Sequence, residues 1–290
     1  MFALSAIHFI LASKKWSTPL DALINSAKNT AVNKISAVNQ NLISIGFWLL
    51  VSTSPPTFAS DCLPERIDQY TTVSHVYDGD TIKLKNGKNV RLIGINTPEM
   101  NYKTGVPEPY AKKARDFLRK KLKNQKIGLL FGPEKKDRYG RLLAHVFLQG
   151  EINLQQALLS KGFAINIAIP PNLSQQDCYL KSENRAKANK IGLWKNHFEN
   201  IIDSKKIKKG QTGFKFVKGN VTEIIQRKKA YWLKLSNKLS LRINQKNLKY
   251  FTNLTIDKLK GKNIIARGWI NYYQERFNMN IKHPDAIEIF

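Results

Sequence analysis

The stretch VYDGDTIKLKNGKNVRLIGINTPE, residues 76–99, decides the fold. It contains two runs, TIKLKN and KNVRLIGI, in which apolar and polar residues alternate as in half-buried β-strands. Asn86-Gly87 lies between the runs, and this dipeptide favours the tight turn of a β-hairpin. The stretch therefore predicts a hairpin whose second strand ends in a polar turn, INTPE.

The segments on either side predict the rest of a small barrel. TTVSHVY, just before the hairpin, alternates like another strand. The spacing of apolar residues and the turn signals downstream predict a helix over 110–123, strands over 126–131 and 141–148, and helices over 153–161 and from about 174 to 189. We expect Asn153 to cap its helix, Gly162 to end it, and Ser174 with Asp177 to form a capping box. This order suits five strands that form a barrel with helices at one end.

Three polar clusters interrupt these elements: DGDT at 78–81, RLIGINTPE at 91–99 and DRYGR at 137–141. Each cluster alone is typical of an ordinary turn. Together they supply what phosphodiester hydrolysis needs. Two guanidinium groups, Arg91 and Arg141, match the charge and geometry of the phosphorane-like transition state. A carboxylate, Glu99, can activate the water as a general base.

A hard divalent cation would add charge at the phosphate, and oxygen donors bind such ions. The candidate ligands are the Asp80 carboxylate, the Asn96 side-chain oxygen and the Thr97 backbone carbonyl.

The clusters lie in text that resembles the staphylococcal nuclease (thermonuclease) family. The matching stretches are VYDGDTIKLKNGKNVRLIGINTPE, KDRYGRLLAHVFLQGEINLQQALLSKGFA and LKSENRAKANKIGLW, which span roughly residues 67–196. The resemblance implies a mostly β, α+β fold: a five-stranded OB-like barrel with three helices. It also implies calcium-dependent cleavage of DNA and RNA.

The resemblance assigns roles to individual residues. It makes Arg91 and Arg141 the phosphate-binding arginines, Glu99 the general base and Tyr139 a contact to the terminal phosphate of a bound nucleotide.

For the metal, the resemblance makes Asp80 the first Ca²⁺ carboxylate and Thr97 the backbone-carbonyl ligand. The chain departs from the family at Asn96, where the family has Asp. An amide oxygen can bind Ca²⁺ but brings no charge, so we expect weaker affinity.

The N-terminal residues 1–60 read as a leader. LISIGFWLLV at 42–51 has the length of a signal-peptide apolar region, and Thr57-Phe58-Ala59 fits cleavage near Ala59. This predicts export to the periplasm or medium of a bacterium; the alternative is an uncleaved amphipathic anchor. Export would place Cys62 and Cys178 in an oxidising compartment, where they can pair or remain as two thiols.

A second domain follows the nuclease-like residues 61–198. Residues 199–212 are polar and contain Gly, which predicts a linker, and residues 213–290 predict a second small OB-like β-barrel: five strands with a short helix between the third and fourth.

This second domain holds much of the excess positive charge. The chain has 48 Lys and Arg against 21 Asp and Glu, for a net charge of +27, and residues 205–290 contain 20 basic and 5 acidic residues. Such an excess indicates a polyanionic partner. Trp232, Trp269 and Arg267 are the candidate contacts to single-stranded nucleic acid, although both tryptophans also suit a barrel core.

We therefore predict an exported nuclease that hydrolyses DNA and RNA with little sequence specificity and prefers single-stranded or denatured DNA. Nothing in the sequence implies a stable protein partner. The alternatives are a non-catalytic nucleic-acid-binding protein with a degenerate nuclease domain, and an envelope protein that binds anionic lipid or glycan. Two cysteines exclude a disulfide-dense mini-protein and zinc fingers built on Cys pairs.

Overall fold

A computed structural model describes residues 62–102, 105–149 and 151–290. The predicted leader over residues 1–60 and its cleavage near Ala59 lie outside the described residues. Within the described ranges, no helix combines the length and apolar character that a membrane crossing requires.

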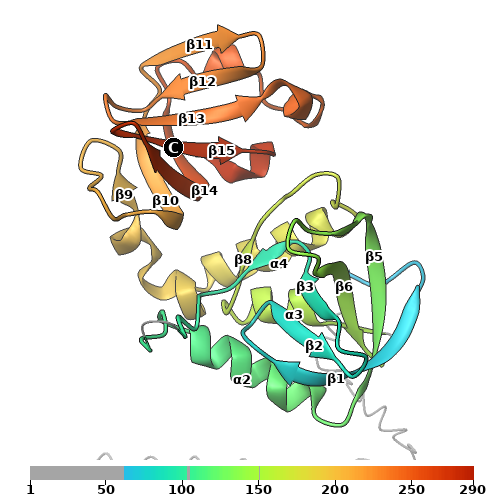
Figure 1. Cartoon of the computed structure of the whole chain (residues 1–290). Helices are drawn as coiled ribbons and strands as arrows, with labels where there is room; N and C mark the ends of the chain where they lie inside the picture. Colours follow the sequence, from blue (N-terminus) through green and yellow to red (C-terminus); the bar gives the residue numbers. More distant parts are fainter. Residues whose placement is uncertain (1–61, 103–104, 150) are drawn as a thin grey trace, which may run out of the picture. The chain divides into compact units, whose positions relative to one another are not determined.

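The first barrel is a closed, five-stranded sheet, as predicted (Figure 1). Its antiparallel strands follow the order β3-β2-β1-β5-β6, and a parallel pairing between β3 and β6 closes the barrel. β7 extends the sheet, and β4 pairs with β8 outside it. The strands are β1 (Gln69–Val76), β2 (Thr81–Leu84), β3 (Asn89–Leu92), β4 (Ile95–Asn96), β5 (Lys126–Lys136), β6 (Leu142–Leu148), β7 (Ile152–Asn153) and β8 (Ile165–Asn166).

Three α-helices accompany this barrel: α2 (Ala111–Leu122), α3 (Leu154–Ser160) and α4 (Gln176–Ala188). The Asn153 side chain caps α3 by accepting from the N–H of Gln156, and Gly162 follows α3 with φ +60°, as the sequence predicts. The predicted capping box of α4 is wrong. No side chain caps α4, and the Ser174 hydroxyl is hydrogen-bonded to Nε2 of His145 instead.

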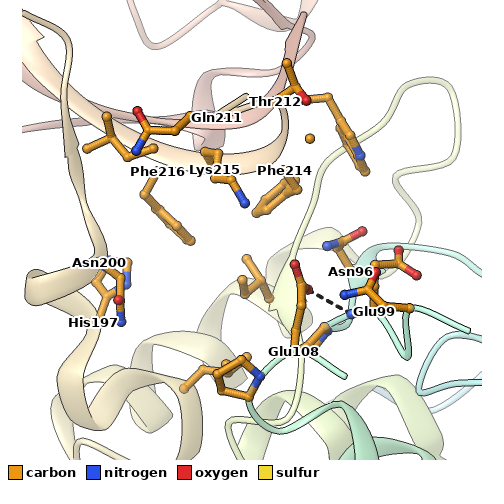
Figure 2. Close-up of a pocket in the computed structure, with 18 of the residues that line it drawn as sticks. Asn96, Glu99, Glu108, His197, Asn200, Gln211, Thr212, Phe214, Lys215 and Phe216 are labelled. Carbon is orange, nitrogen blue, oxygen red and sulfur yellow. Dashed lines mark hydrogen bonds between the residues drawn. The ribbon is translucent and has the colours of Figure 1, made fainter. Parts of the chain in front are cut away.

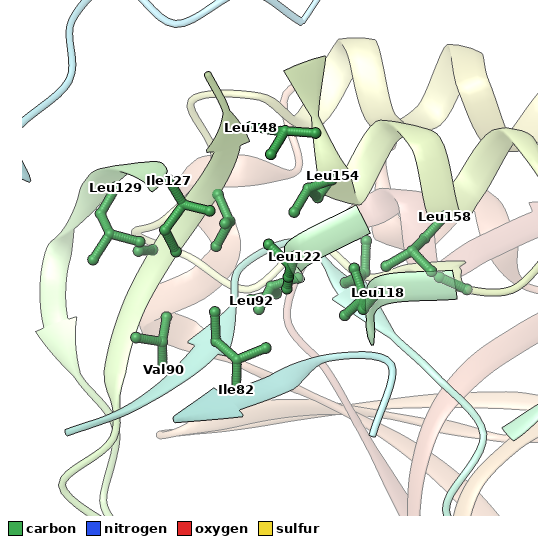
Figure 3. Close-up of a cluster of buried hydrophobic side chains, with 14 of the residues drawn as sticks. Ile82, Val90, Leu92, Leu118, Leu122, Ile127, Leu129, Leu148, Leu154 and Leu158 are labelled. Carbon is green, nitrogen blue, oxygen red and sulfur yellow. The ribbon is translucent and has the colours of Figure 1, made fainter. Parts of the chain in front are cut away.

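The core of the first barrel follows from the alternation in the opening stretch. Inward positions of β2 and β3 place Ile82 and Val90 in one buried cluster with Leu118 of α2 and Leu158 of α3, which Figure 3 shows. All four are 0% exposed. Cys62 and Cys178 form a disulfide at the edge of this core, so the structure pairs the two cysteines.

The second barrel has the same circular strand order as the first, with the consecutive strands β10 and β11 in the place of β1, and β12, β13, β14 and β15 in the places of β2, β3, β5 and β6. Its strands run β11-β12-β13-β15-β14-β10-β9, with β13 parallel to β15, as β3 is parallel to β6 in the first barrel. Short 3-10 helices, η2 and η3, lie between the third and fourth main strands, as predicted for an OB-like barrel. The elements are β9 (Ile202–Asp203), β10 (Gly213–Asn220), β11 (Glu223–Arg227), β12 (Ala230–Lys234), β13 (Leu239–Asn244), η2 (Gln245–Tyr250), η3 (Ile256–Leu259), β14 (Asn263–Tyr273), β15 (Arg276–Ile281), η4 (Pro284–Ala286) and β16 (Ile287–Ile289).

The segment predicted as a linker, residues 199–212, is structured. It contains the end of the 3-10 helix η1 (Gly192–Asn200) and strand β9, which pairs with β10. Ile207 is 1% exposed and belongs to the second core, and the buried Ser204 donates to the carbonyl of Leu235. Most of this polar segment therefore packs as part of the second barrel.

Candidate active site

Asp80 is the centre of the site and lies in the turn between β1 and β2. It is 5% exposed. Its Oδ2 accepts from the backbone N–H of Thr97 at 2.9 Å and from the Thr97 hydroxyl at 3.1 Å. Gly79 precedes it because a Cβ there would meet Cβ of Ala114 at 2.6 Å and Cγ2 of Thr97 at 2.7 Å. The DGD sequence thus allows the turn to lie directly beneath α2 and the INTPE turn.

Arg91 reaches Asp80 because the hairpin register brings them together. Thr81 on β2 pairs with Arg91 on β3, which places the guanidinium beside the residue that precedes Thr81. Nη2 of Arg91 lies 3.0 Å from Oδ2 of Asp80, and Nη1 donates to the carbonyl of Leu92 at 2.7 Å. The Arg91 side chain is only 13% exposed, so its guanidinium is held in place in a low-dielectric setting.

Asn96 and Thr97 enter the site where β4 ends. Asn96 pairs with Ile165 of β8 and is 9% exposed, and Thr97 is 2% exposed. The two hydrogen bonds from Thr97 to Asp80 fasten the INTPE turn to the DGD turn. The structure therefore places Thr97 in contact with Asp80, and Asn96 is its neighbour in the chain.

Glu99 is held by a residue that sequence reasoning missed, Glu108. The backbone N–H of Glu99 donates to Oε2 of Glu108 at 2.8 Å, and the N–H of Glu108 donates to the Glu99 carbonyl at 2.9 Å. Figure 2 shows the first of these bonds at the edge of a cavity. Burial raises the pKa of Glu99, and the negative charges of Asp80 and Glu108 raise it further. The positive charges of Arg91 and Arg141 lower it, but the net effect is a raised pKa. A raised pKa moves a carboxylate towards the range that suits a general base.

Arg141 is oriented by Asp137 across the turn between β5 and β6. Nε of Arg141 donates to Oδ2 of Asp137 at 2.7 Å, and the backbone N–H of Arg141 donates to Oδ1 at 3.0 Å. Burial would raise the pKa of Asp137, but these bonds and one from the N–H of Tyr139 hold it below its ordinary value. Thr81 links the two halves of the site: its hydroxyl donates to Asp80 at 3.0 Å and lies 3.4 Å from Nη1 of Arg141.

Tyr139 lies at the open side of this turn. Its side chain is 68% exposed, and its hydroxyl accepts from Nη2 of Arg138 at 2.6 Å. The guanidinium carbons of Arg138 and Arg141 lie 4.8 and 5.5 Å from the ring centroid. Tyr139 therefore stands beside a predicted phosphate-binding arginine with its ring accessible.

Asp78 is a second carboxylate of the DGDT cluster, and the sequence predicts no role for it. Its Oδ1 accepts from the N–H of Asp80 at 2.9 Å. Burial, followed by the negative charge of Asp80, raises the pKa of Asp78 to about 7. A buried carboxylate whose pKa is raised by burial and by a neighbouring charge is a common feature of active sites.

The three predicted contacts of the second barrel have different surroundings. Trp269 is 42% exposed. Trp232 is half-buried on β12, with the guanidinium of Arg242 5.7 Å from its ring centroid. Arg267 is 8% exposed, and its Nη1 lies 2.6 Å from Oε2 of Glu183, which is itself fully buried. Its Nε and Nη2 donate to the carbonyl of Asp285. Arg267 is thus engaged in a structural ion pair and not presented to solvent.

The arrangement can bind and polarise a phosphate. Arg91 comes from β3 and Arg141 from the turn between β5 and β6, and their charges act on the Glu99 carboxylate. The buried Asp80 contacts Arg91 directly and is connected to Arg141 through Thr81. In the described ranges, no three His, Cys, Asp or Glu side chains are placed to hold a metal ion. The predicted ligand set is of another kind, because an amide and a backbone carbonyl stand beside a carboxylate. Fold and site together are those of an OB-barrel protein with a candidate phosphate-binding site.

Comparison with known proteins agrees. Residues 89–196 match the family model described as staphylococcal nuclease homologue. The thermonuclease of Staphylococcus hyicus is 35% identical over 158 residues, which cover 53% of this chain and 92% of that protein. The thermonuclease of Staphylococcus intermedius is 37% identical over 125 residues, covering 42% of this chain and 74% of that protein. The endonuclease YncB of Bacillus subtilis (strain 168) is 34% identical over 128 residues, covering 42% and 60%. The chain belongs to the staphylococcal nuclease homologue family.

This membership confirms the predicted family resemblance. In general terms it supports a phosphodiester-hydrolysing endonuclease with nucleic acid as its substrate class.

Proposed function

We propose that the chain is an exported, calcium-dependent nuclease that hydrolyses DNA and RNA with low sequence specificity. The observation that carries the proposal is the connected set around Asp80: this buried carboxylate touches Arg91 and Thr97 directly, and Thr81 connects it to Arg141. No local turn preference requires these contacts, since they join residues from three separate segments of the chain.

The proposed reaction is attack of water on the phosphorus of a phosphodiester. Glu99 accepts a proton from the water as its oxygen forms the new P–O bond, and the leaving oxygen departs with the electron pair of the broken P–O bond and takes up a proton from solvent. Arg91 and Arg141 stabilise the negative charge that develops on the phosphate oxygens. Asp80 and Asp137 hold these two guanidinium groups in orientation, at 3.0 and 2.7 Å.

The chemistry of the donors fits a Ca²⁺ ion. Asp80 and Asn96 offer side-chain oxygens and Thr97 a backbone carbonyl, all of the hard type that Ca²⁺ prefers. Burial is the main cause of the raised pKa values of Asp78 and Glu99, and the negative charge of Asp80 raises both further, which a bound cation would offset. When bound, Ca²⁺ would polarise the phosphate and add positive charge to it.

The disulfide supports export. Cys62 and Cys178 are bonded in the structure, and such bonds persist mainly in oxidising compartments outside the cytosol. N-terminal sequencing of the protein from the periplasm and from the medium of a bacterial host tests this part of the proposal. Retention of residues 1–60 in the cytosolic fraction would contradict it.

Hydrolysis is tested with the purified protein lacking residues 1–60, denatured DNA and RNA, in Ca²⁺ or in chelator. The Glu99→Gln variant keeps the shape of the side chain and removes the base. We expect Ca²⁺-dependent cleavage by the wild type and a loss of about 100-fold or more in kcat for the variant.

Equal rates for both proteins would rule out Glu99 as the base. Binding of DNA without any cleavage would favour the alternative of a non-catalytic nucleic-acid-binding protein.

A further inference from the structure

Two cavities flank the candidate catalytic residues, and one side chain of the second barrel borders both. The first cavity, of about 640 Å³, is lined by Asn96, Glu99 and Trp269 among others. The second, of about 570 Å³, is lined by Arg91, Arg141 and Trp269 among others. Trp269 therefore borders the cavity that the proposed base lines and also the cavity that the proposed phosphate-binding groups line.

The first cavity has walls from distant parts of the sequence. Figure 2 shows Asn96 and Glu99 on one side of it and the β10 residues Phe214, Lys215 and Phe216 on the other. The second barrel thus contributes several side chains to the space in front of Glu99.

Trp269 has the exposure of a binding residue and not of a core residue. Its neighbour Ile270 points into the core and is 2% exposed, whereas Trp269 lies on the outer face of β14 and is 42% exposed. Its ring meets Phe214 in a T-shaped contact, with centroids 5.0 Å apart. Exposed aromatic rings beside cationic groups are the stacking platforms of single-strand-binding proteins.

β14 is fastened to the first barrel two residues before Trp269. There the buried ion pair joins Arg267 to Glu183 of α4 at 2.6 Å. A second connection lies nearby, where Nε2 of Gln176 donates to Oδ2 of Asp285 at 2.6 Å. These two contacts fix the position of β14, and with it Trp269, relative to α4 of the first barrel.

Lys282 adds a cation to the second cavity. It follows β15 and lines the cavity together with Arg138 and Arg141. Burial lowers the pKa of Lys282, Glu134 raises it, and the positive charges of Lys246 and Arg138 lower it. An ammonium group placed among guanidinium groups is typical of a site that binds a phosphate.

We propose that the second barrel forms one wall of the catalytic cleft, where Trp269 stacks on a base of a single-stranded substrate and Lys282 binds a flanking phosphate. The inference rests on the proposed nuclease function and gives it a substrate preference, because a stacked base has to be unpaired. The second barrel would therefore act on nucleotides close to the scissile bond. A tether that only retained long polymers would act far from it.

A short substrate separates these two roles. We compare kcat and KM for a single-stranded oligonucleotide of about four nucleotides, roughly the smallest span of one OB barrel. The variants are Trp269→Ala, Trp269→Phe and Lys282→Gln. Tyr273→Ala is the matched control, since Tyr273 is 68% exposed on the same strand and lines neither cavity. Lys260→Gln is the control for loss of an exposed positive charge.

We expect Trp269→Ala to lower kcat/KM by about 5- to 150-fold, the range for loss of one stacked base, and Trp269→Phe to recover part of it. Lys282→Gln should reduce the slope of log affinity against log salt concentration by about 0.7. The control variants should stay near the wild type. A Trp269→Ala value within twofold of the wild type, or an equal loss in Tyr273→Ala, would overturn the inference.

Binding separates this inference from the proposed function. Fluorescence anisotropy of the same labelled oligonucleotide is measured in the Glu99→Gln background, with and without Trp269→Ala. One outcome is that the wild type shows no cleavage, while Trp269→Ala still weakens binding. The proposed nuclease function is then wrong, and the inference that the second barrel forms a wall of the cleft is supported. The opposite outcome is that the wild type cleaves and Trp269→Ala changes neither binding nor kcat/KM. The inference about the second barrel is then wrong, and the proposed nuclease function is supported.

Discussion

Breaking the buried ion pair between Glu183 and Arg267 should destabilise the protein far more than breaking an exposed one. The Glu183 carboxylate is fully buried, and the Arg267 side chain is 8% exposed. Arg267→Met leaves Glu183 buried with Nζ of Lys187 3.7 Å from its Oε2 and the N–H of Asn166 donating to its Oε1. Loss of one member of a buried pair costs about 3–5 kcal/mol, and we expect about 3 here because Lys187 remains.

The chain offers a matched control at the same distance. Lys234 and Glu223 on the second barrel are also 2.6 Å apart, but their side chains are 41% and 50% exposed. An exposed pair contributes at most about 1 kcal/mol, so Lys234→Met should have a small effect. The contrast between the two variants measures what burial adds.

Urea unfolding, followed by tryptophan fluorescence and by circular dichroism, gives the free energies. Two probes are needed because a chain with two cores need not unfold in one step. The double variant Glu183→Gln/Arg267→Met should be less destabilised than the sum of its single variants, by about 2 kcal/mol or more. The reasoning would be refuted if Glu183→Gln or Arg267→Met alone cost less than 0.5 kcal/mol. It would also be refuted if the costs of these two single variants added up in the double variant.

Three further predictions concern the site and the core. Asn96→Asp should lower the Ca²⁺ concentration for half-maximal cleavage by about tenfold, since affinity follows ligand charge, and an unchanged requirement would show that Asn96 is not a ligand. Gly79→Ala should cost about 1–3 kcal/mol in unfolding experiments, because its Cβ would lie 2.6 Å from that of Ala114, and a neutral result would contradict the packing of the DGD turn. Burial lowers the pKa of His145 from 6.5 to about 4. Between pH 4 and pH 6.5 the unfolded chain therefore binds more protons at this residue than the folded chain does. Stability should be complete above pH 6.5 and fall by up to about 3 kcal/mol towards pH 4, and His145→Gln should flatten this slope in unfolding curves at pH 7 and 5.

The sequence predicts those parts of the fold that depend on short-range signals. Strand alternation and the Asn86-Gly87 turn specify the hairpin, and its register then places Arg91 beside Asp80. Asn153 caps α3 because its side chain is adjacent to the free backbone N–H groups.

Other features depend on partners that no local pattern announces. Glu108 holds Glu99 across a loop whose sequence shows no periodicity. The residues around Arg267 in the sequence do not indicate that it forms a buried ion pair with Glu183. Ser174 has the sequence signature of a cap, but a distant histidine, His145, competes for its hydroxyl. In each case the deciding interaction comes from tertiary packing.

The disulfide closes a long covalent loop in the first barrel. Cys62 and Cys178 are 116 residues apart in sequence, and Asp80, Glu99 and Arg141 all lie between them. Together with the backbone they form a covalent ring that contains the candidate active site. One proteolytic cut inside this ring opens it without releasing a fragment, and the pairing of β1 with β5 and of β3 with β6 keeps the two pieces aligned. Loss of the site from the molecule therefore requires a second cut or reduction of the sulfur bond.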